Sequence, residues 1–176
     1  MLTADPDTFE ALFTINHPKI LKYAQRRLPT LALAEDIAAE VFTAAWQSWS
    51  EGQRPQLPWL YRVAANKIAD RYRSDERKEA VQIALTRLHE EPGHTADPLD
   101  LLSLRDALLL LGDRDREAIT LHYWEGLNAS EIAEVLGCST PNAWTTLSRA
   151  RKRLRHALSD TTDQAPLQRS AMKKAR

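Results

Sequence analysis

Cysteine is nearly absent from this chain of 176 residues, which holds only Cys138. A single thiol cannot close an intramolecular disulfide, so the chain is not a disulfide-stapled secreted domain and suits a reducing compartment. Its five histidines lack the spacing of metal ligands, and we expect no metal and no other cofactor. No apolar run approaches the roughly 18 residues of a membrane span, and the acidic N-terminus lacks the apolar stretch of a signal peptide. We therefore expect a cytoplasmic protein with no membrane insertion.

Glycine is also scarce, and none of the five glycines forms the glycine-rich loop that binds phosphates in nucleotide-binding proteins. The sequence likewise contains no nucleophile elbow and no cluster of metal-binding side chains. These absences argue against the common classes of catalytic site. We therefore expect a binding protein and not an enzyme.

Net charge is absent as well, because 24 Lys and Arg balance 24 Asp and Glu. A net charge of zero argues, by itself, against a protein that binds nucleic acid. The distribution is uneven, however: five basic residues lie within 149–155, and acidic residues outnumber basic ones in 75–112. The overall balance therefore conceals a local basic surface and an acidic middle segment.

Apolar residues recur at intervals of three and four, and the sustained alternation typical of strands does not occur. We therefore predict an all-α protein of two small helical domains joined by a flexible linker. The segment 75–96 is charged and resembles a linker, although Ala80 to Leu88 is periodic and could be helical, and the tail after Leu158 is polar and basic. The predicted parts are a first domain over 7–74, a linker over 75–96, a second domain over 97–159 and a disordered tail over 160–176.

The stretch from Asp113 to His156 has the features of a helix-turn-helix followed by a basic helix. Asn128 and Glu131 form a capping box, in which each side chain would bond the backbone N–H of the other residue. A short helix from Ala129 to Leu136 should follow. Gly137 suits its end, because glycine adopts the left-handed conformation without a Cβ penalty.

The second helix of this unit has its own start signals, with Ser139 or Thr140 as cap and Pro141 in the first turn. The side chains that it should bury are Ala143, Leu147, Ala150 and Leu154. The basic cluster in 149–155 then suits contacts with phosphates. A surface hairpin with a solvated basic helix is the alternative, but the capped helix, the glycine turn and the second helix together favour nucleic-acid binding.

The first domain should begin with a helix capped by Asp7, with Glu10 three residues on. Pro18 is expected to begin or kink the next segment, because proline lacks the N–H that a helix interior requires. Pro29 should end that segment. The domain is therefore predicted to open with two helical segments.

Two longer helices are predicted next, from Ala34 to Ser50 and from Trp59 to Arg73, with a loop marked by Gly52 between them. Each has an apolar stripe and a polar row. The stripes are Ile37, Val41, Ala44 and Ala45 in the first helix, and Leu60, Ala64, Ile68 and Tyr72 in the second. The polar rows could be solvated helix faces, and the three tryptophans nearby, Trp46, Trp49 and Trp59, could be core.

Two sets of motifs are similar to the two conserved regions of one bacterial protein family, the sigma factors. Region 2 is similar to Ala34-Glu35-Asp36-Ile37, Glu40-Val41-Phe42, Ala45-Trp46 and Trp59-Leu60-Tyr61-Arg62-Val63-Ala64 with Asn66 and Asp70. Region 4 is similar to Arg114-Asp115-Arg116-Glu117-Ala118, Tyr123-Trp124-Glu125-Gly126-Leu127, Glu131-Ile132-Ala133-Glu134-Val135-Leu136-Gly137 and Arg149-Ala150-Arg151-Lys152-Arg153-Leu154. Both occur in the family's order, over about 9–73 and 111–155. The chain resembles the sigma-70 superfamily, extracytoplasmic-function (ECF, group IV) type.

This resemblance implies a protein that binds core RNA polymerase and directs promoter-specific initiation. Region 2 would open and read the minus-ten element, and region 4 would read the minus-thirty-five element. An anti-sigma factor is a further implied partner, and the free chain should be a monomer. The implied polymerase contacts are Asp36, Glu40, Thr43 and Gln47. The implied minus-ten contacts are Trp59, Arg62, Asn66, Lys67, Asp70, Arg71 and Arg73. The implied minus-thirty-five contacts are Asn142, Trp144, Thr145, Ser148, Arg149, Arg151, Lys152 and Arg153.

The chain departs from the family's pattern at three places. Ala39 stands where the family often has Gln, and Ala65 stands where a basic residue is common. The stretch 143–146 reads Ala-Trp-Thr-Thr, where the family usually carries one or two basic residues. The candidates for reading base edges are therefore Asn142, Thr145, Ser148 and Arg149, and of these only Arg149 can hold a guanine with two hydrogen bonds. Trp144 could contact a thymine methyl, a sugar or a partner protein, or pack half-buried.

A helix-turn-helix regulator that acts without core polymerase is the alternative function. Such regulators usually bind as two-fold dimers. A regulator would not need the domain that contains Asp36 and Trp59, and no dimerisation heptad is visible in the sequence. The two functions therefore differ in whether DNA binding depends on polymerase.

Overall fold

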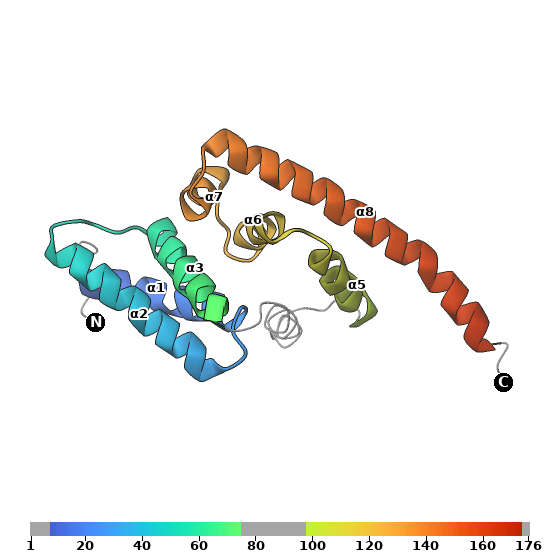
Figure 1. Ribbon diagram of the computed structural model, residues 1–176, viewed down its shortest axis with the longest axis horizontal. Helices are drawn as coiled ribbons and strands as arrows, with labels where there is room; N and C mark the ends of the chain where they lie inside the picture. The colour runs from blue at the N-terminus through green and yellow to red at the C-terminus, as the bar shows by residue number, and fades with distance from the viewer. Residues whose placement is uncertain (1–7, 75–97, 174–176) are drawn as a thin grey trace, which may run out of the picture.

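The computed structural model of the chain describes residues 8–74 and 98–173, with side chains in 8–72 and 104–159. This part of the chain is helical, as predicted, and contains no strand. The predicted linker and the predicted cap Asp7 lie outside it. The N-terminal domain consists of α1 (Phe9–Gln25), α2 (Leu31–Ser50) and α3 (Leu57–Ser74). The C-terminal domain consists of α5 (Pro98–Leu109), α6 (Asp113–Tyr123), α7 (Ala129–Leu136) and α8 (Thr140–Lys173) (Figure 1).

Helix α1 is continuous, so the prediction of two segments divided at Pro18 is wrong. Its cap is Thr8, whose hydroxyl oxygen accepts the N–H of Ala11 at 3.2 Å. Pro18 lies in the helix interior, where proline typically costs about 3 kcal/mol. Leu12 before it and Ile20 after it both pack on the core of the domain. Packing of the apolar face therefore outweighs the local preference, as it does in most protein helices.

Helices α2 and α3 begin slightly earlier than predicted and have the expected apolar stripes. The Thr30 hydroxyl oxygen caps α2 by accepting the N–H of Leu33 at 3.2 Å. The stripe residues that are buried are Ile37, Val41 and Ala45 in α2, and Leu60, Ala64 and Ile68 in α3. Ala44 and Tyr72 are only partly buried. The polar rows on these helices consequently face away from the core.

The helix-turn-helix of the C-terminal domain has the predicted local structure. The Asn128 Oδ1 atom accepts the N–H groups of Ser130 and Glu131, at 2.9 and 3.1 Å, and Glu131 accepts the N–H of Asn128 at 2.8 Å. Gly137 ends α7 with φ 61 and ψ 45, the left-handed conformation expected there. The predicted stripe of α8 is buried at Ala143, Leu147 and Ala150 and partly buried at Leu154.

Arg116 of α6 connects α5 to the rest of the C-terminal domain. Its guanidinium donates to the backbone oxygens of Leu108 and Leu111, at 2.9 and 2.7 Å, at the C-terminal end of α5. The Leu108 oxygen also accepts the N–H of Leu111 at 3.2 Å, so the arginine adds a second donor there and binds the Leu111 oxygen just beyond the helix end. Leu108 and Leu111 also form an apolar cluster with Ile119 and Ala150. Helix α5 is therefore fixed to α6 and α8 by polar and apolar contacts together.

Helix α8 continues to Lys173, whereas the sequence predicted a disordered tail from residue 160 onward. The extension adds residues to a helix that already exists, so it avoids the unfavourable nucleation step. Eight of the fourteen added residues are good helix formers, whereas Pro166 lacks the N–H that a helix interior requires.

The two domains are in contact, which the prediction of domains on a flexible linker did not include. Helix α3 of the N-terminal domain packs against α7 of the C-terminal domain (Figure 1). A single apolar cluster includes Leu60 and Ala64 from α3 and Ile132 and Ala133 from α7. The free chain is therefore closed, with the helix-turn-helix resting on α3.

Polar side chains surround this apolar contact and join the same two domains. The Glu117 carboxylate of α6 accepts hydrogen bonds from the Tyr23 hydroxyl at 2.7 Å and from the Arg27 Nε and NH2 atoms at 3.1–3.3 Å. The Arg27 guanidinium also lies 3.6 Å from the centre of the Tyr23 ring and donates to the Thr120 hydroxyl at 3.0 Å. Arg27, just beyond the C-terminal end of α1, is thus paired with Glu117 in the middle of α6.

A second carboxylate, Glu125, repeats this arrangement with other partners. It accepts from the Arg26 NH1 atom at 2.8 Å and from the Tyr61 hydroxyl at 3.1 Å, and its side chain is 4% exposed. A carboxylate so deeply buried is stable only when it is paired and hydrogen-bonded, as this one is. We call these six side chains the interdomain network: Tyr23, Arg26, Arg27, Tyr61, Glu117 and Glu125.

The tyrosines of the network act as neutral hydrogen-bond donors. Burial raises the pKa of Tyr23 well above its ordinary value of 10.0, and the Arg27 guanidinium opposes this shift only in part. Burial, and then the charge of Glu125, also raise the pKa of Tyr61. Both hydroxyls therefore stay protonated at physiological pH and can donate to the two carboxylates.

We expect Arg27→Ala to lower the free energy of unfolding by about 2–3 kcal/mol, because it leaves the Glu117 carboxylate without its charged partner. Both side chains are largely buried, at 15% and 25% exposed. Urea unfolding monitored by circular dichroism measures the change. The exposed Lys19 on α1 is the control, and Lys19→Ala should change stability by less than about 0.5 kcal/mol. Equal losses for both variants would show that the network contributes nothing specific.

Candidate nucleic-acid interface

The outward face of α8 carries most of the candidate base-reading side chains in exposed positions. Those exposed are Asn142, Trp144, Thr145, Ser148, Arg149, Lys152 and Arg153, while Arg151 is partly buried. The Ser139 hydroxyl oxygen accepts the N–H of Asn142 at 3.4 Å, beside the first turn. The face therefore projects from the second helix of a helix-turn-helix, the geometry with which such helices enter a major groove.

Arg149 and Arg153, one turn apart on α8, share a single buried carboxylate. Asp115 of α6 accepts from the Arg149 NH2 and Nε atoms at 2.8 and 3.3 Å, and from the Arg153 NH1 atom at 2.9 Å. Its side chain is 4% exposed, whereas those of the arginines are about half exposed, at 49% and 58%. Hydrogen bonding to Asp115 raises the pKa of Arg149 above its ordinary value. Both arginines are therefore held on one flank of α8 with their outer sides open.

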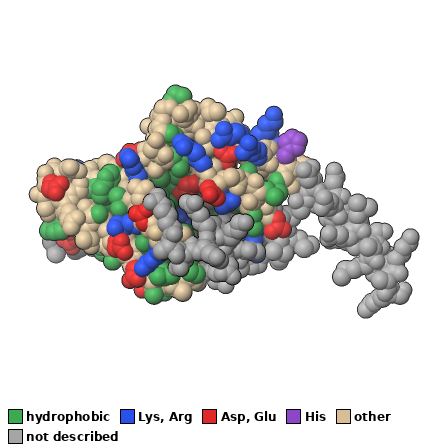
Figure 2. All heavy atoms as spheres, viewed as in Figure 1, with side chains coloured by type: hydrophobic (Ala, Val, Ile, Leu, Met, Phe, Trp, Pro, Cys, Tyr) green, Lys and Arg blue, Asp and Glu red, His purple; other side chains and the backbone are tan. Residues whose placement is uncertain are grey.

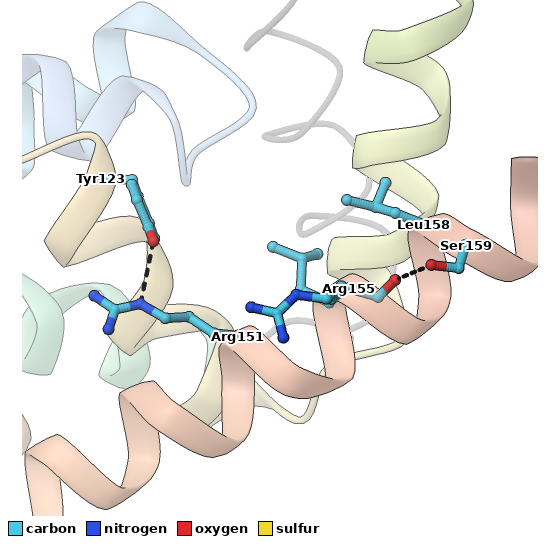
Figure 3. Close-up of a pocket in the computed structure, with 6 residues that line it drawn as sticks. Tyr123, Arg151, Arg155, Leu158 and Ser159 are labelled. Carbon is cyan, nitrogen blue, oxygen red and sulfur yellow. Dashed lines mark hydrogen bonds between the residues drawn. The ribbon is translucent and has the colours of Figure 1, made fainter.

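The opposite flank of α8 borders a shallow cavity of about 420 Å³ against the end of α6 (Figure 3). The Arg151 Nε atom donates to the Tyr123 hydroxyl at 3.1 Å, and the side chain of Arg155 lies along the same cavity. Leu154 and Leu158 supply apolar lining. One donor of Arg151 is thus bound to Tyr123 of the same chain, whereas Lys152 is exposed.

The candidate minus-ten residues lie on α3, and three of them, Arg62, Asn66 and Asp70, are fully exposed. Two others pair with α2: the Lys67 Nζ atom lies 2.8 Å from a carboxylate oxygen of Glu40, and the Arg71 NH2 atom lies 3.9 Å from one of Asp36. These are surface pairs, with Glu40 and Asp36 49% and 62% exposed. The side chain of Arg73 lies outside the described residues.

The four candidate polymerase-contacting residues share one exposed face of α2. They are Asp36, Glu40, Thr43 and Gln47. The Thr43 hydroxyl donates to the backbone oxygen of Ala39 at 2.8 Å, one turn earlier. Because Glu40 and Asp36 also pair with α3, this face adjoins the candidate minus-ten face directly.

The tryptophans of the N-terminal domain have different environments, which settles the question left by the sequence. Trp59 is half-buried and packs against the main core, so it is partly structural. Trp46 is 54% exposed and meets the edge of Phe9, with ring centres 4.9 Å apart. Trp49 also contacts Phe9, and the Arg54 guanidinium lies 4.1 Å from the centre of its ring. An aromatic surface therefore lies beside the loop before α3.

The surface of the molecule shows the uneven charge that the sequence indicated. Figure 2 shows Lys and Arg side chains gathered along part of α8, and basic and acidic side chains mixed over the N-terminal domain. The described residues contain no group of His, Cys, Asp or Glu side chains that could hold a metal ion. In that part of the chain, no helix has the length and apolar character required to span a bilayer.

Sequence reasoning missed the residues whose role depends on partners far away in the chain. Asp115, Glu117 and Glu125 appear in the sequence as ordinary charges on a helical segment. Their partners lie 34 to 99 residues away, a distance that helical periodicity cannot address. No local signal could have identified these pairs, because residues 11–34, around Arg26 and Arg27, contain no acidic residue.

Comparisons with known proteins identify both domains. Residues 12–78 match the family described as Sigma-70 region 2, and residues 101–154 match Sigma-70, region 4. The chain is 29% identical over 166 residues to the RNA polymerase sigma factor YlaC of Bacillus subtilis, covering 90% of this chain and 96% of that one. It is 29% identical over 163 residues to the ECF RNA polymerase sigma factor SigL of Mycobacterium tuberculosis, covering 89% and 92%.

A solved structure gives the same answer for the fold. The chain resembles CnrH in its complex with the cytosolic domain of CnrY, with a TM-score of 0.63, 25% identity and coverage of 90% and 92% of the two chains. The motifs, the helical architecture and the two matched regions therefore agree. The chain belongs to the sigma-70 family as an extracytoplasmic-function sigma factor, which binds core RNA polymerase and directs it to promoters.

Proposed function

We propose that three exposed helix faces of this sigma factor each bind a different partner. The α2 face binds core polymerase, the α3 face takes the minus-ten element, and the N-terminal half of α8 reads the minus-thirty-five element. The observation that carries this proposal is that each candidate set lies along one helix and that its described side chains are exposed or partly exposed. The protein would act in the cytoplasm as a binding factor, and not as an enzyme.

The α2 face suits a docking surface for polymerase because its four candidates are polar and exposed. Asp36 and Glu40 offer carboxylates that can pair with basic residues of a partner. Their present partners on α3, Lys67 and Arg71, are 31% and 36% exposed, and pairs at the surface are worth only about 0–1 kcal/mol. Exchange of these pairs for contacts with polymerase would therefore cost little.

The α3 face suits single-stranded DNA because it combines cations, an amide and a nearby aromatic ring. Arg62 and Lys67 can bind phosphates, and the Asn66 amide can bond a base edge. Trp59 lies in the first turn of this helix, where an unpaired base could stack, and Trp46 on α2 has an exposed ring. This combination is typical of proteins that hold an opened strand.

The α8 face suits duplex DNA, although its first turns carry no basic residue. Asn142, Thr145 and Ser148 can bond base edges, and Arg149 can bond a guanine. Affinity would then come from the basic residues that follow in 149–155. Trp144, which is 57% exposed, could meet a thymine methyl or a sugar at the edge of this contact.

The closed form of the free chain cannot bind both promoter elements at once. Positions minus ten and minus thirty-five are about 25 base pairs apart, which at about 3.4 Å per pair is on the order of 85 Å. In the closed form, α3 lies against α7, and the Tyr61 hydroxyl is 3.1 Å from Glu125. We infer that core polymerase separates the domains and that the interdomain network opens when it does.

An anti-sigma factor would be a second partner of this chain. CnrH, which shares its fold, is described in complex with the cytosolic domain of CnrY. By analogy, such a partner could hold the two domains together. The chain would then be unable to bind both promoter elements. The free chain would otherwise be a monomer.

Run-off transcription distinguishes this function from that of a helix-turn-helix regulator. Start sites would first be mapped by sequencing the transcripts that appear when the chain is overproduced. We expect bare core polymerase to initiate at these promoters only when the chain is added, and the chain alone to bind them weakly. Tight binding by the isolated chain as a dimer on a palindrome, without any run-off product, would instead identify a regulator.

We expect Asn66→Ala to impair promoter opening while stability and polymerase binding stay normal, because Asn66 is exposed. Trp59→Ala should impair opening and also lower the melting temperature, because its ring packs on the core. Loss of one stacked base costs about 1–3 kcal/mol. Permanganate footprinting beside a thermal melt measures both effects, with Lys19→Ala as control. A normal footprint for Asn66→Ala would remove Asn66 from the site.

Domain separation can be measured directly by fluorescence energy transfer. In a Cys138→Ser background, dyes on Thr14→Cys in α1 and Glu134→Cys in α7 report the distance between the domains, since both positions are exposed. We expect efficient transfer in the free chain and a marked loss on addition of core polymerase. Arg27→Ala should lower the transfer in the free chain. Equal transfer with and without polymerase would contradict the opening.

A further inference from the structure

Asp115 differs from other acidic residues near the candidate DNA surface because it is buried and faces two arginines. Its side chain is 4% exposed and accepts three hydrogen bonds, two from Arg149 and one from Arg153. It lies in the first turn of α6, outside the reading helix. Asp113, two residues earlier, is 85% exposed and pairs with Arg116 of its own helix. Of these two carboxylates, Asp115 is the one that reaches α8.

The pairing leaves Arg149 with only one edge available to DNA. A guanidinium has five N–H donors in a rigid plane, and the Nε and NH2 edge of Arg149 is bound to Asp115. The edge formed by NH1 and the second hydrogen of NH2 remains, and it also offers two parallel donors. Two such donors match the O6 and N7 acceptors of guanine. Because the plane is fixed by Asp115, this edge can point in only one direction.

We propose that Asp115 is a positioning residue for the minus-thirty-five element: it holds Arg149 in the orientation that reads a guanine and holds Arg153 beside it for a phosphate. The inference rests on the proposed role of Arg149 in DNA reading. Arginine loses rotamer freedom when its side chain is ordered. Because Asp115 orders the Arg149 side chain when the protein folds, that entropy is not lost again when the protein binds DNA.

Asp115 could also serve only to join α6 to α8, and the two roles predict different results. Apolar contacts already join these helices, since Ile119 of α6 and Ala150 of α8 belong to one buried cluster. A purely structural Asp115 would affect stability and all promoters equally. A positioning Asp115 affects preference at one base pair, and only when Arg149 is present.

The test uses full-length chain in holoenzyme, with a promoter library randomised over the minus-thirty-five element and constant at the minus-ten element. We expect Asp115→Asn and Arg149→Ala to reduce preference at the same guanine, by about three- to tenfold and about tenfold respectively. The double variant should be no worse than Arg149→Ala, because the residues act as a unit. Asp115→Asn should also steepen the salt dependence of binding by up to about one unit, because it removes a negative charge. Asp113→Asn is the matched control and should leave the preference unchanged.

Arg149→Lys keeps the test valid if Asp115→Asn folds poorly, since lysine retains the charge but cannot form the two parallel bonds. We expect Arg149→Lys to lose the guanine preference while its salt dependence stays near that of the wild type. A folded Asp115→Asn with the wild-type preference at every position would overturn the inference, and so would full preference in Arg149→Lys. A wild-type holoenzyme that selects no minus-thirty-five sequence would instead refute the proposed function, which separates the two failures.

Discussion

The buried carboxylates Glu117 and Glu125 set the arrangement of the whole molecule. Each would be costly to bury alone, and each is stable because two side chains of the other domain bind it. A contact of this kind is specific, since no other register pairs the same groups. It can also open again, because water solvates the separated charges. An interface made only of apolar surface could not replace its contacts by contacts with water in this way. A protein whose two DNA elements lie far apart needs an interdomain contact that can open reversibly.

Local features of the fold could be predicted from the sequence, because they depend on residues three or four positions apart. The capping box of Asn128 and Glu131 is confirmed, and Gly137 has the left-handed conformation predicted for it. The apolar stripes were also correct, down to Ala143 and Ala150 on α8. Pro18 shows where this reasoning fails, because its local cost is outweighed by packing on both sides of it.

The candidate binding sites were also predictable in part. Which side chains are exposed on α2, α3 and α8 follows from helical periodicity, so the candidate faces could be drawn without coordinates. The contacts of those side chains could not be predicted from the sequence. Arg149 looked free to meet a base, whereas it is bound to Asp115, 34 residues away. From the sequence, Trp59 could have been a surface or a core residue, and in the structure its side chain is partly buried. Such pairings depend on how helices cross, which no spacing within one helix determines.

The zero net charge of this DNA-binding protein also has a structural explanation. Many of its cations are matched to carboxylates within the chain: Arg27 to Glu117, Lys67 to Glu40, and Arg149 and Arg153 to Asp115. The Arg27 pair holds the domains closed, and the exposed Lys67 pair lies on the faces proposed for polymerase and DNA. The buried Asp115 holds Arg149 and Arg153 with their outer sides open. Because exposed pairs are worth little, phosphates or a partner's charges can replace them at small cost. We therefore expect internal neutrality to weaken DNA binding by the free chain without removing the cations that a polymerase complex would use.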